Sequence, residues 1–267
     1  MNSHLFSKGY EIINLDESKY HLDVFLNEFK SIIISQLDFI KVNYIDNEGI
    51  NQLLVKLFDN DLQRYLSTLR LASKLMCVSE LVNCKEILNF SKKNGIHLPV
   101  MQTRPVLHLI GDDLMIPGGY NGVGAHQDWP TLQSSLNTMV VWIPLVDVNE
   151  QNYTLDIIPK SHLKGLLTGS LNSNFTEIEQ SNYSESEFIP LKIKKGQAFI
   201  MSSFLIHRSN MNGKGYRISI SSRIEDAMES TFIERNFPYT EHKVVKRDLL
   251  FENFPNINQV LKVYSNE

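Results

Sequence analysis

The chain has 267 residues and a net charge of −4 at pH 7, so it shows no electrostatic footprint for nucleic acid. Apolar residues make up 42% of the sequence, enough to bury a core, and no apolar run approaches the roughly 18 residues that a membrane span needs. The acidic residues Glu11, Asp16 and Glu17 precede any long apolar run, which predicts that the N-terminal segment is not a signal peptide.

Helices are predicted for the first hundred residues. Apolar residues follow helical spacing in 22–40 and again in 62–69. A third helix is expected over 79–95, where a terminal glycine suits a C-terminal cap. Cys77 and Cys84 lie on one helical stripe. We interpret them as reduced core residues of a cytoplasmic protein rather than as a disulfide or metal pair.

After Pro99 the pattern changes to short apolar runs separated by turn residues. These runs are rich in β-branched and aromatic residues, and they predict strands at 106–110, 139–146, 155–158, 188–193, 198–206 and 217–224. Polar residues 172–187 are expected to form a loop insertion between strands.

Helices followed by strands predict a mainly β sandwich or barrel with an α-helical flank, rather than alternating βαβ units. We expect one domain of three parts. Residues 1–98 form a helical N-terminal flank, 99–225 form the β core, and 226–267 form a C-terminal extension.

A candidate metal site begins with the motif His126-Gln127-Asp128. If this segment is a strand, residues two apart share a face, so the imidazole and the carboxylate can reach one ion. The apolar pattern 199–207 is interpreted as a strand that ends in a second histidine, His207. Two histidines and one carboxylate occupy three corners of an octahedron and leave three positions open, as in non-haem iron(II) oxygenases.

Ten residues beyond His207, alternation places Arg217, Ser219, Ser221 and Arg223 on one face of a predicted strand. Taken alone, this pattern is typical of a strand whose polar face lies in water. Beside an iron site with three open positions, another interpretation is better. A bidentate keto acid would fill two positions and dioxygen the third, and an arginine fork would bind the distal carboxylate of the keto acid.

Four motifs occur in order between residues 104 and 224. They are Ala125-His126-Gln127-Asp128-Trp129, Val141-Trp142-Ile143-Pro144-Leu145, Ile158-Pro159-Lys160-Ser161-His162, and His207-Arg208-Ser209 leading to Arg217. With these motifs the sequence resembles the phytanoyl-CoA dioxygenase-like branch of the iron(II)/2-oxoglutarate oxygenases. Lys160 replaces the glycine usual in the third motif, and lysine tolerates positive φ poorly, so we expect a turn of different shape there. His162 is interpreted as structural rather than as a fourth ligand.

The resemblance implies a double-stranded β-helix, a jelly roll or cupin-like barrel, that binds Fe(II), 2-oxoglutarate as co-substrate and O2. It implies that His126, Asp128 and His207 are the iron ligands and the catalytic centre. By the same resemblance Arg217 binds the distal carboxylate of 2-oxoglutarate. Two serines compete as its hydroxyl partner: Ser209 and Ser219. Three further residues are expected to line the pocket, although hydrogen bonds inside the barrel would explain them equally well: Gln133, Asn137 and His108.

The implied reaction is hydroxylation of a small-molecule substrate with release of succinate and CO2. The carboxylate of Asp128 favours hydroxylation over halogenation, because related halogenases have a small residue there; desaturation and cyclisation stay open. We expect a polar biosynthetic metabolite, with a carrier-bound or CoA-linked acyl group as the alternative. No nucleic acid or membrane partner is expected, and the sequence indicates no oligomeric state.

Two other classes compete with the oxygenase. One is a cupin-type metal enzyme that does not use 2-oxoglutarate. Cupins show His-x-His followed by a glutamate, whereas no acidic residue occurs between Asp128 and Asp147. The other is a non-catalytic binding protein on the same barrel. Such a protein would be free to lose a ligand, and this sequence keeps all three.

Overall fold

The computed structural model describes residues 4–101, 103–116, 122–171, 176–238 and 254–265. Its largest sheet is antiparallel, with neighbouring strands in the order β1, β9, β4 and β11, and with β3 on the other edge of β11. The short strand β2 pairs with the end of β11. The bounds are β1 Tyr10–Asn14, β2 Pro99–Val100, β3 Val106–Gly111, β4 Met139–Pro144, β9 Gln197–Ser202 and β11 Tyr216–Asp226.

A smaller antiparallel sheet faces the large one, with the order β10, β5, β8. Its strands are β5 Leu155–Ile157, β8 Ile189–Pro190 and β10 His207–Ser209, and beside it lies the hairpin of β6 Gly169–Leu171 and β7 Thr176–Ile178. Residues of both sheets share one apolar cluster that includes Trp142, Leu155 and Phe199. This arrangement confirms a mainly β jelly-roll fold with helices.

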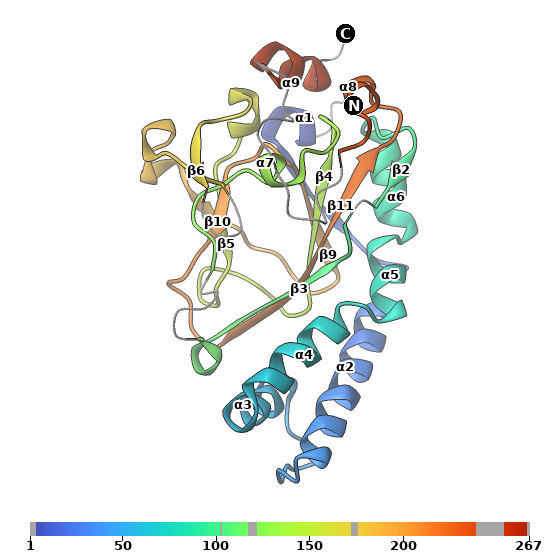
Figure 1. The fold of residues 1–267 in the computed structure, drawn as a ribbon, viewed down its shortest axis with the longest axis vertical. Coiled ribbons are helices and arrows are strands. Elements are labelled where there is room, and N and C mark those ends of the chain that lie inside the picture. The colour runs from blue at the N-terminus through green and yellow to red at the C-terminus, as the bar shows by residue number, and fades with distance from the viewer. Residues whose placement is uncertain (1–3, 102, 117–121, 172–175, 239–253, 266–267) are drawn as a thin grey trace.

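The other face of the large sheet carries a layer of helices (Figure 1). These are α2 Tyr20–Phe39, α3 Ile50–Asn60, α4 Leu62–Ala72, α5 Met76–Val82 and α6 Lys85–Lys93. Helix α2 presents apolar residues such as Phe25, Phe29 and Ile33, all completely buried, to a core shared with Ile218 and Ile220 of β11. The helical layer therefore leaves β11 no solvent-exposed apolar face.

Short helices complete the fold: α1 His4–Lys8, α7 Trp129–Leu132, α8 Ser230–Glu234 and α9 Ile257–Tyr264, with 3₁₀ turns at Asp112–Leu114, Ser161–Lys164, Gln180–Asn182 and Glu185–Glu187. Helix α9 packs Val260 against Trp129 and Phe204. Helices α9 and α7 therefore share one apolar cluster. Among the described residues, no helix is both long enough and apolar enough to cross a membrane.

The N-terminal and insertion regions differ from expectation. Within the flank expected to be helical, β1 pairs with β9 through Tyr10↔Met201, so part of 1–98 belongs to the large sheet. The helix expected over 79–95 is two helices, α5 and α6, separated at Asn83 and Cys84. The insertion expected as a loop contains β7, although residues 172–175 lie outside the described part.

Two expected strands are also shorter than predicted by at least three residues. The ladder expected over 188–193 is limited to Ile189–Pro190, and the strand expected over 198–206 ends at Ser202. Lys160 adopts a left-handed conformation with φ of 67°, so this turn takes a glycine-like shape in spite of the side chain. The expectation of a different turn was wrong, and the lysine there costs roughly 1–2 kcal/mol.

Candidate metal centre

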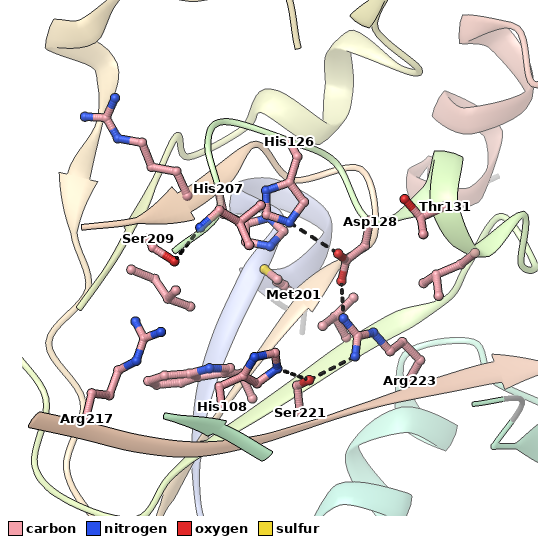
Figure 2. Close-up of a pocket in the computed structure, with 16 residues that line it drawn as sticks. His108, His126, Asp128, Thr131, Met201, His207, Ser209, Arg217, Ser221 and Arg223 are labelled. Carbon is pink, nitrogen blue, oxygen red and sulfur yellow. Dashed lines mark hydrogen bonds and ion pairs between the residues drawn. The ribbon is translucent and has the colours of Figure 1, made fainter. Parts of the chain in front are cut away.

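A pocket lies between the two sheets, and both polar and apolar side chains line it (Figure 2). Three titratable side chains gather at one end, and Arg217 lies at the other. The lining residues are His108, Val123, His126, Asp128, Thr131, Leu132, Val140, Trp142, Leu155, Met201, His207, Arg208, Ser209, Arg217, Ser221 and Arg223.

The candidate metal ligands are His126, Asp128 and His207, whose possible ligand atoms all lie within 4.8 Å of one another. The backbones of the two histidines pair directly: the amide of His126 donates to the carbonyl of His207 at 3.0 Å, and the reverse bond is 3.1 Å. This pairing sets the ring centroids 4.1 Å apart. The fold therefore brings together residues that are far apart in sequence.

Gln127 explains why His126 and Asp128 face the same way. Its side chain points into the protein, where the amide nitrogen donates to the carbonyls of Gly165 and Phe204, both at 2.8 Å. Only a one-residue bridge forms at His126, and Asp128 is the N-cap of α7. The expectation that both lie on a strand was therefore wrong, but the side chains still alternate about Gln127.

Hydrogen bonds to backbone carbonyls fix both imidazoles. Nδ1 of His126 lies 2.8 Å from the carbonyl of Gly124, and Nδ1 of His207 lies 3.0 Å from that of Leu205. A carbonyl can only accept, so each Nδ1 carries the proton and each Nε2 keeps its lone pair for a metal. Burial, and after it the neighbouring His126, lower the pKa of His207 to about 3, which keeps this ring neutral.

Asp128 supplies the carboxylate. Burial alone would raise the pKa of Asp128, but the guanidinium of Arg223 reverses this and holds the pKa well below its usual range. The carboxylate is thus ionised at neutral pH. Two imidazole nitrogen donors and one anionic oxygen donor fit a divalent metal such as iron(II), with positions left open for other ligands.

Arg217 is 1% exposed and lines the pocket. Its Nη1 donates to the carbonyls of Tyr153 at 2.6 Å and Thr154 at 3.2 Å, and its guanidinium carbon lies 5.7 Å from the ring centre of Trp142. These contacts hold a cation inside an apolar wall, where it can bind an anionic group of a ligand.

The two candidate serines occupy different surroundings. Ser209 lines the pocket, and its hydroxyl accepts a hydrogen bond from the amide of Val123 at 3.1 Å. Ser219 is completely buried between Arg217 and Ser221 on β11, and it is not a lining residue. Position favours Ser209 as the hydroxyl nearest a ligand.

Of the three expected pocket residues, only His108 lines the cavity. Burial and the nearby arginines lower the pKa of His108 to about 3, so the ring is neutral. Gln133 instead ends α7 in a left-handed conformation, and its carbonyl accepts from Arg235. Asn137 donates to the carbonyl of Gly95 and to Asp226. Both anchor loops, so their placement in the pocket was wrong.

Arg223 is a pocket residue that the motifs did not identify. Its Nη2 lies 3.2 Å from Oδ2 of Asp128. The alternating pattern from Arg217 to Arg223 could have identified it. That pattern places Arg223 on the same strand face as Arg217, the residue expected to bind 2-oxoglutarate. His207 was also misplaced: it begins β10 in the smaller sheet instead of ending β9.

Comparisons with known proteins point to one family for the segment that carries the site. Residues 114–217 match the family model for phytanoyl-CoA dioxygenase (PhyH). The chain is 30% identical over 105 residues to phytanoyl-CoA dioxygenase domain-containing protein 1 of Danio rerio, covering 36% of each protein. It is 27% identical over 99 residues to the homolog from Dictyostelium discoideum, covering 34% of this chain and 35% of that protein.

The matched segment thus spans only about a third of the length of these relatives. In fold, the chain is similar to the apo form of the non-haem monooxygenase ThoJ. The TM-score is 0.58 at 16% identity, over 84% of this chain and 76% of that one. Residues 114–217, which include all three candidate ligands and Arg217, are therefore similar in sequence to the phytanoyl-CoA dioxygenase family, and the chain is similar in fold to ThoJ.

Proposed function

We propose that this chain is an iron(II)- and 2-oxoglutarate-dependent oxygenase that hydroxylates a small molecule and releases succinate and CO2. The observation that carries the proposal is the shared cavity: three prepared metal donors lie at one end, and the buried guanidinium of Arg217 lies at the other. A ligand that chelates a metal through one end and carries a carboxylate at the other fits this arrangement.

In this proposal His126, Asp128 and His207 hold iron(II). When bound, iron(II) with 2-oxoglutarate and dioxygen supplies the oxidant that hydroxylates a substrate C–H bond. Arg217 binds the distal carboxylate of 2-oxoglutarate, because a charge-assisted contact is strong where water is excluded. Ser209 adds a hydroxyl beside it. The chain's own contribution is to position these groups and keep water away.

Apolar side chains provide that exclusion. Trp142, Leu155 and Met201 line the pocket and belong to the fully packed cluster between the sheets. A dry wall beside Arg217 strengthens its attraction for a carboxylate and makes the contact costly to lose. This supports a ligand whose anionic end is completely buried.

The substrate is proposed to be a small polar metabolite. Thr131, Ser221 and His108 bring polar groups to the end of the lining that also contains Asp128 and Arg223. Carboxylate at position 128 supports hydroxylation rather than halogenation, since a halide would need that coordination position.

We also propose that the chain works as one oxygenase domain in the cytoplasm. Support for a single unit comes from the core that the helical layer shares with β4 and β11. Support for a reducing compartment comes from Cys77 and Cys84, both buried free thiols.

Turnover tests this function. Purified protein with iron(II), ascorbate and 2-oxoglutarate should release succinate, and a library of small metabolites should contain compounds that accelerate the release. The His207→Ala variant, which removes one donor, should release none above background. Folded, iron-loaded protein that consumes no 2-oxoglutarate, alone or with any metabolite, would contradict the proposal.

A further inference from the structure

A chain of polar contacts leads from β3 and β11 to one of the metal ligands (Figure 2). Nε2 of His108 lies 2.8 Å from the hydroxyl of Ser221, and Nη1 of Arg223 donates to the same hydroxyl at 2.9 Å. Nη2 of Arg223 then donates to Oδ2 of Asp128 at 3.2 Å. These hydrogen bonds are not explained by metal binding through the three candidate ligands or by the binding of 2-oxoglutarate.

The two oxygens of Asp128 face different partners. Oδ1 lies 3.5 Å from Nε2 of His126, on the side of the metal set, whereas Oδ2 forms the ion pair with Arg223. A carboxylate can bind a metal through one oxygen or through both. The oxygen that Arg223 holds is therefore the one that would have to be released for two-oxygen binding.

Arg223 is firmly held. It lies on β11 where that strand pairs with β4 through Arg223↔Val140, and its side chain is 15% exposed. Ser221, which accepts from Nη1, is 2% exposed and is fixed from the other side by His108. The guanidinium is thus anchored at one nitrogen while the other holds Asp128, and groups placed like this fix ligand orientation in metal sites.

We propose that Arg223 is a positioning residue that reserves Oδ2 of Asp128, so that the carboxylate binds the metal through Oδ1 alone. One-oxygen binding keeps three of six coordination positions open. That a keto acid and dioxygen occupy these open positions rests on the proposed function. Which oxygen of Asp128 binds the metal does not depend on it. A further oxygen ligand from Asp128 would take one of those positions.

The number of waters on a bound Mn(II) ion measures this choice without any co-substrate. Relaxation of ¹⁷O-labelled water should count about three waters in the wild-type protein, the positions that three protein ligands leave on an octahedral ion. Arg223→Met keeps much of the side-chain length but no charge, and it should hold about one water fewer. Arg223→Lys restores a charge without the fork and should give an intermediate count.

Arg208→Met is the matched control. Arg208 also lines the pocket and is also ion-paired, but with Asp156 at 3.1 Å and Glu185 at 2.7 Å, neither of them a candidate ligand. Its Mn(II) should keep the wild-type water count. A drop in this control as large as in Arg223→Met would show a general disturbance of the pocket and would overturn the proposal.

Metal affinity gives a second readout. Loss of Arg223 removes both an orienting partner and a cation near the metal, and these effects oppose each other, so Mn(II) affinity should stay within about tenfold of wild type while the water count falls. Folding is checked by circular dichroism. If Arg223→Met does not fold, Ser221→Ala replaces it as the test. This variant removes only one partner of Arg223, so it should lower the water count by a smaller amount. Wild-type counts in Arg223→Met, or in Ser221→Ala and Arg223→Lys together, would refute the role.

This outcome is separable from the proposed function. A protein that binds Mn(II) with the expected water counts but does not bind 2-oxoglutarate would disprove the co-substrate and leave the role of Arg223 intact. A protein that binds 2-oxoglutarate with equal water counts in all variants would do the reverse.

Discussion

The two faces of β11 are both buried, yet they serve different purposes. On one face Ile218, Ile220 and Ile224 pack into the core shared with the helical layer. On the other, Arg217 and Arg223 reach into the pocket between the sheets. Alternation along one strand therefore separates packing from chemistry, residue by residue.

The difference teaches how a polar face should be interpreted. A strand with alternating polarity usually has its polar face in water, yet the polar face of β11 includes Arg217 at 1% exposure and Ser219 at 0%. Buried charges are usually paired or hydrogen-bonded, and such groups cluster at functional sites. Changes on the two faces should therefore have different consequences for binding and for stability.

The largest effect is expected across the cavity from β11, at His207. His207→Ala removes one of three metal donors, so the protein should lose specific iron(II) binding, measured by anaerobic equilibrium dialysis. The fold should survive, because the imidazole of His207 lines the pocket and is not part of a packed apolar cluster. Iron(II) affinity equal to wild type in the folded variant would rule out His207 as a ligand.

Arg217→Ala tests the polar face itself. Leaving the carboxylate of a bound co-substrate unpaired in a buried site costs about 3–5 kcal/mol. The apparent 2-oxoglutarate requirement should therefore rise by about a hundredfold or more, since each 1.4 kcal/mol is tenfold. Iron(II) affinity should change far less.

Arg217→Lys is the matched variant for this position. A lysine keeps the charge but cannot reproduce the planar fork, so it should recover only part of the loss. An unchanged 2-oxoglutarate requirement in Arg217→Ala would remove co-substrate recognition from this strand.

Ile220→Ala tests the apolar face. Ile220 is completely buried and pairs with Leu107 on one side and Ile143 on the other. Its truncation should lower the free energy of unfolding by about 2–5 kcal/mol, measured by denaturant titration. The 2-oxoglutarate requirement of the folded variant should stay within a few-fold of wild type, and a large rise would show that the two faces are not separate.

A pH-dependent effect on stability is expected at Glu225, near the end of the polar face. Burial raises the pKa of Glu225 from 4.5 to about 8, although the cation of Arg235 and the backbone of Ser135 act to lower it. At a pH between 4.5 and about 8, Glu225 is protonated in the folded protein but ionised in the unfolded chain. The free energy of unfolding therefore falls as pH rises through this range.

Glu225→Gln cannot ionise and should escape this penalty. Its Tm relative to wild type should increase progressively between about pH 5 and pH 8. A Tm difference that stays constant across this range would contradict a raised pKa at Glu225.

Much of the site was predictable from local sequence because it depends on motifs. His126 and Asp128 flank Gln127, whose side-chain amide forms hydrogen bonds inside the protein. The side chains of His126 and Asp128 therefore point to the opposite side, even without a strand. The strands around Ile110, Val141 and Ile220 were predictable from β-branched runs, and α2 from the spacing of Phe25, Phe29 and Ile33.

The rest depended on long-range partners. Tyr10–Asn14 is a strand because β9 offers an edge, a contact that no local pattern encodes. Gln133 and Asn137 follow the metal motif closely, yet Arg235 and Asp226 draw them into anchoring loops. Arg223 could be placed on the correct face, but its pairing with Asp128 required the register of β11 against β4.

The central claim is that one cavity holds a metal and a keto acid together. Anaerobic titration of the iron(II)-loaded protein with 2-oxoglutarate tests it most directly, followed by visible absorption. We predict a weak charge-transfer band that grows to saturation at about one equivalent and is absent from His207→Ala. Saturating 2-oxoglutarate that produces no band in the iron-loaded wild-type protein would contradict the account.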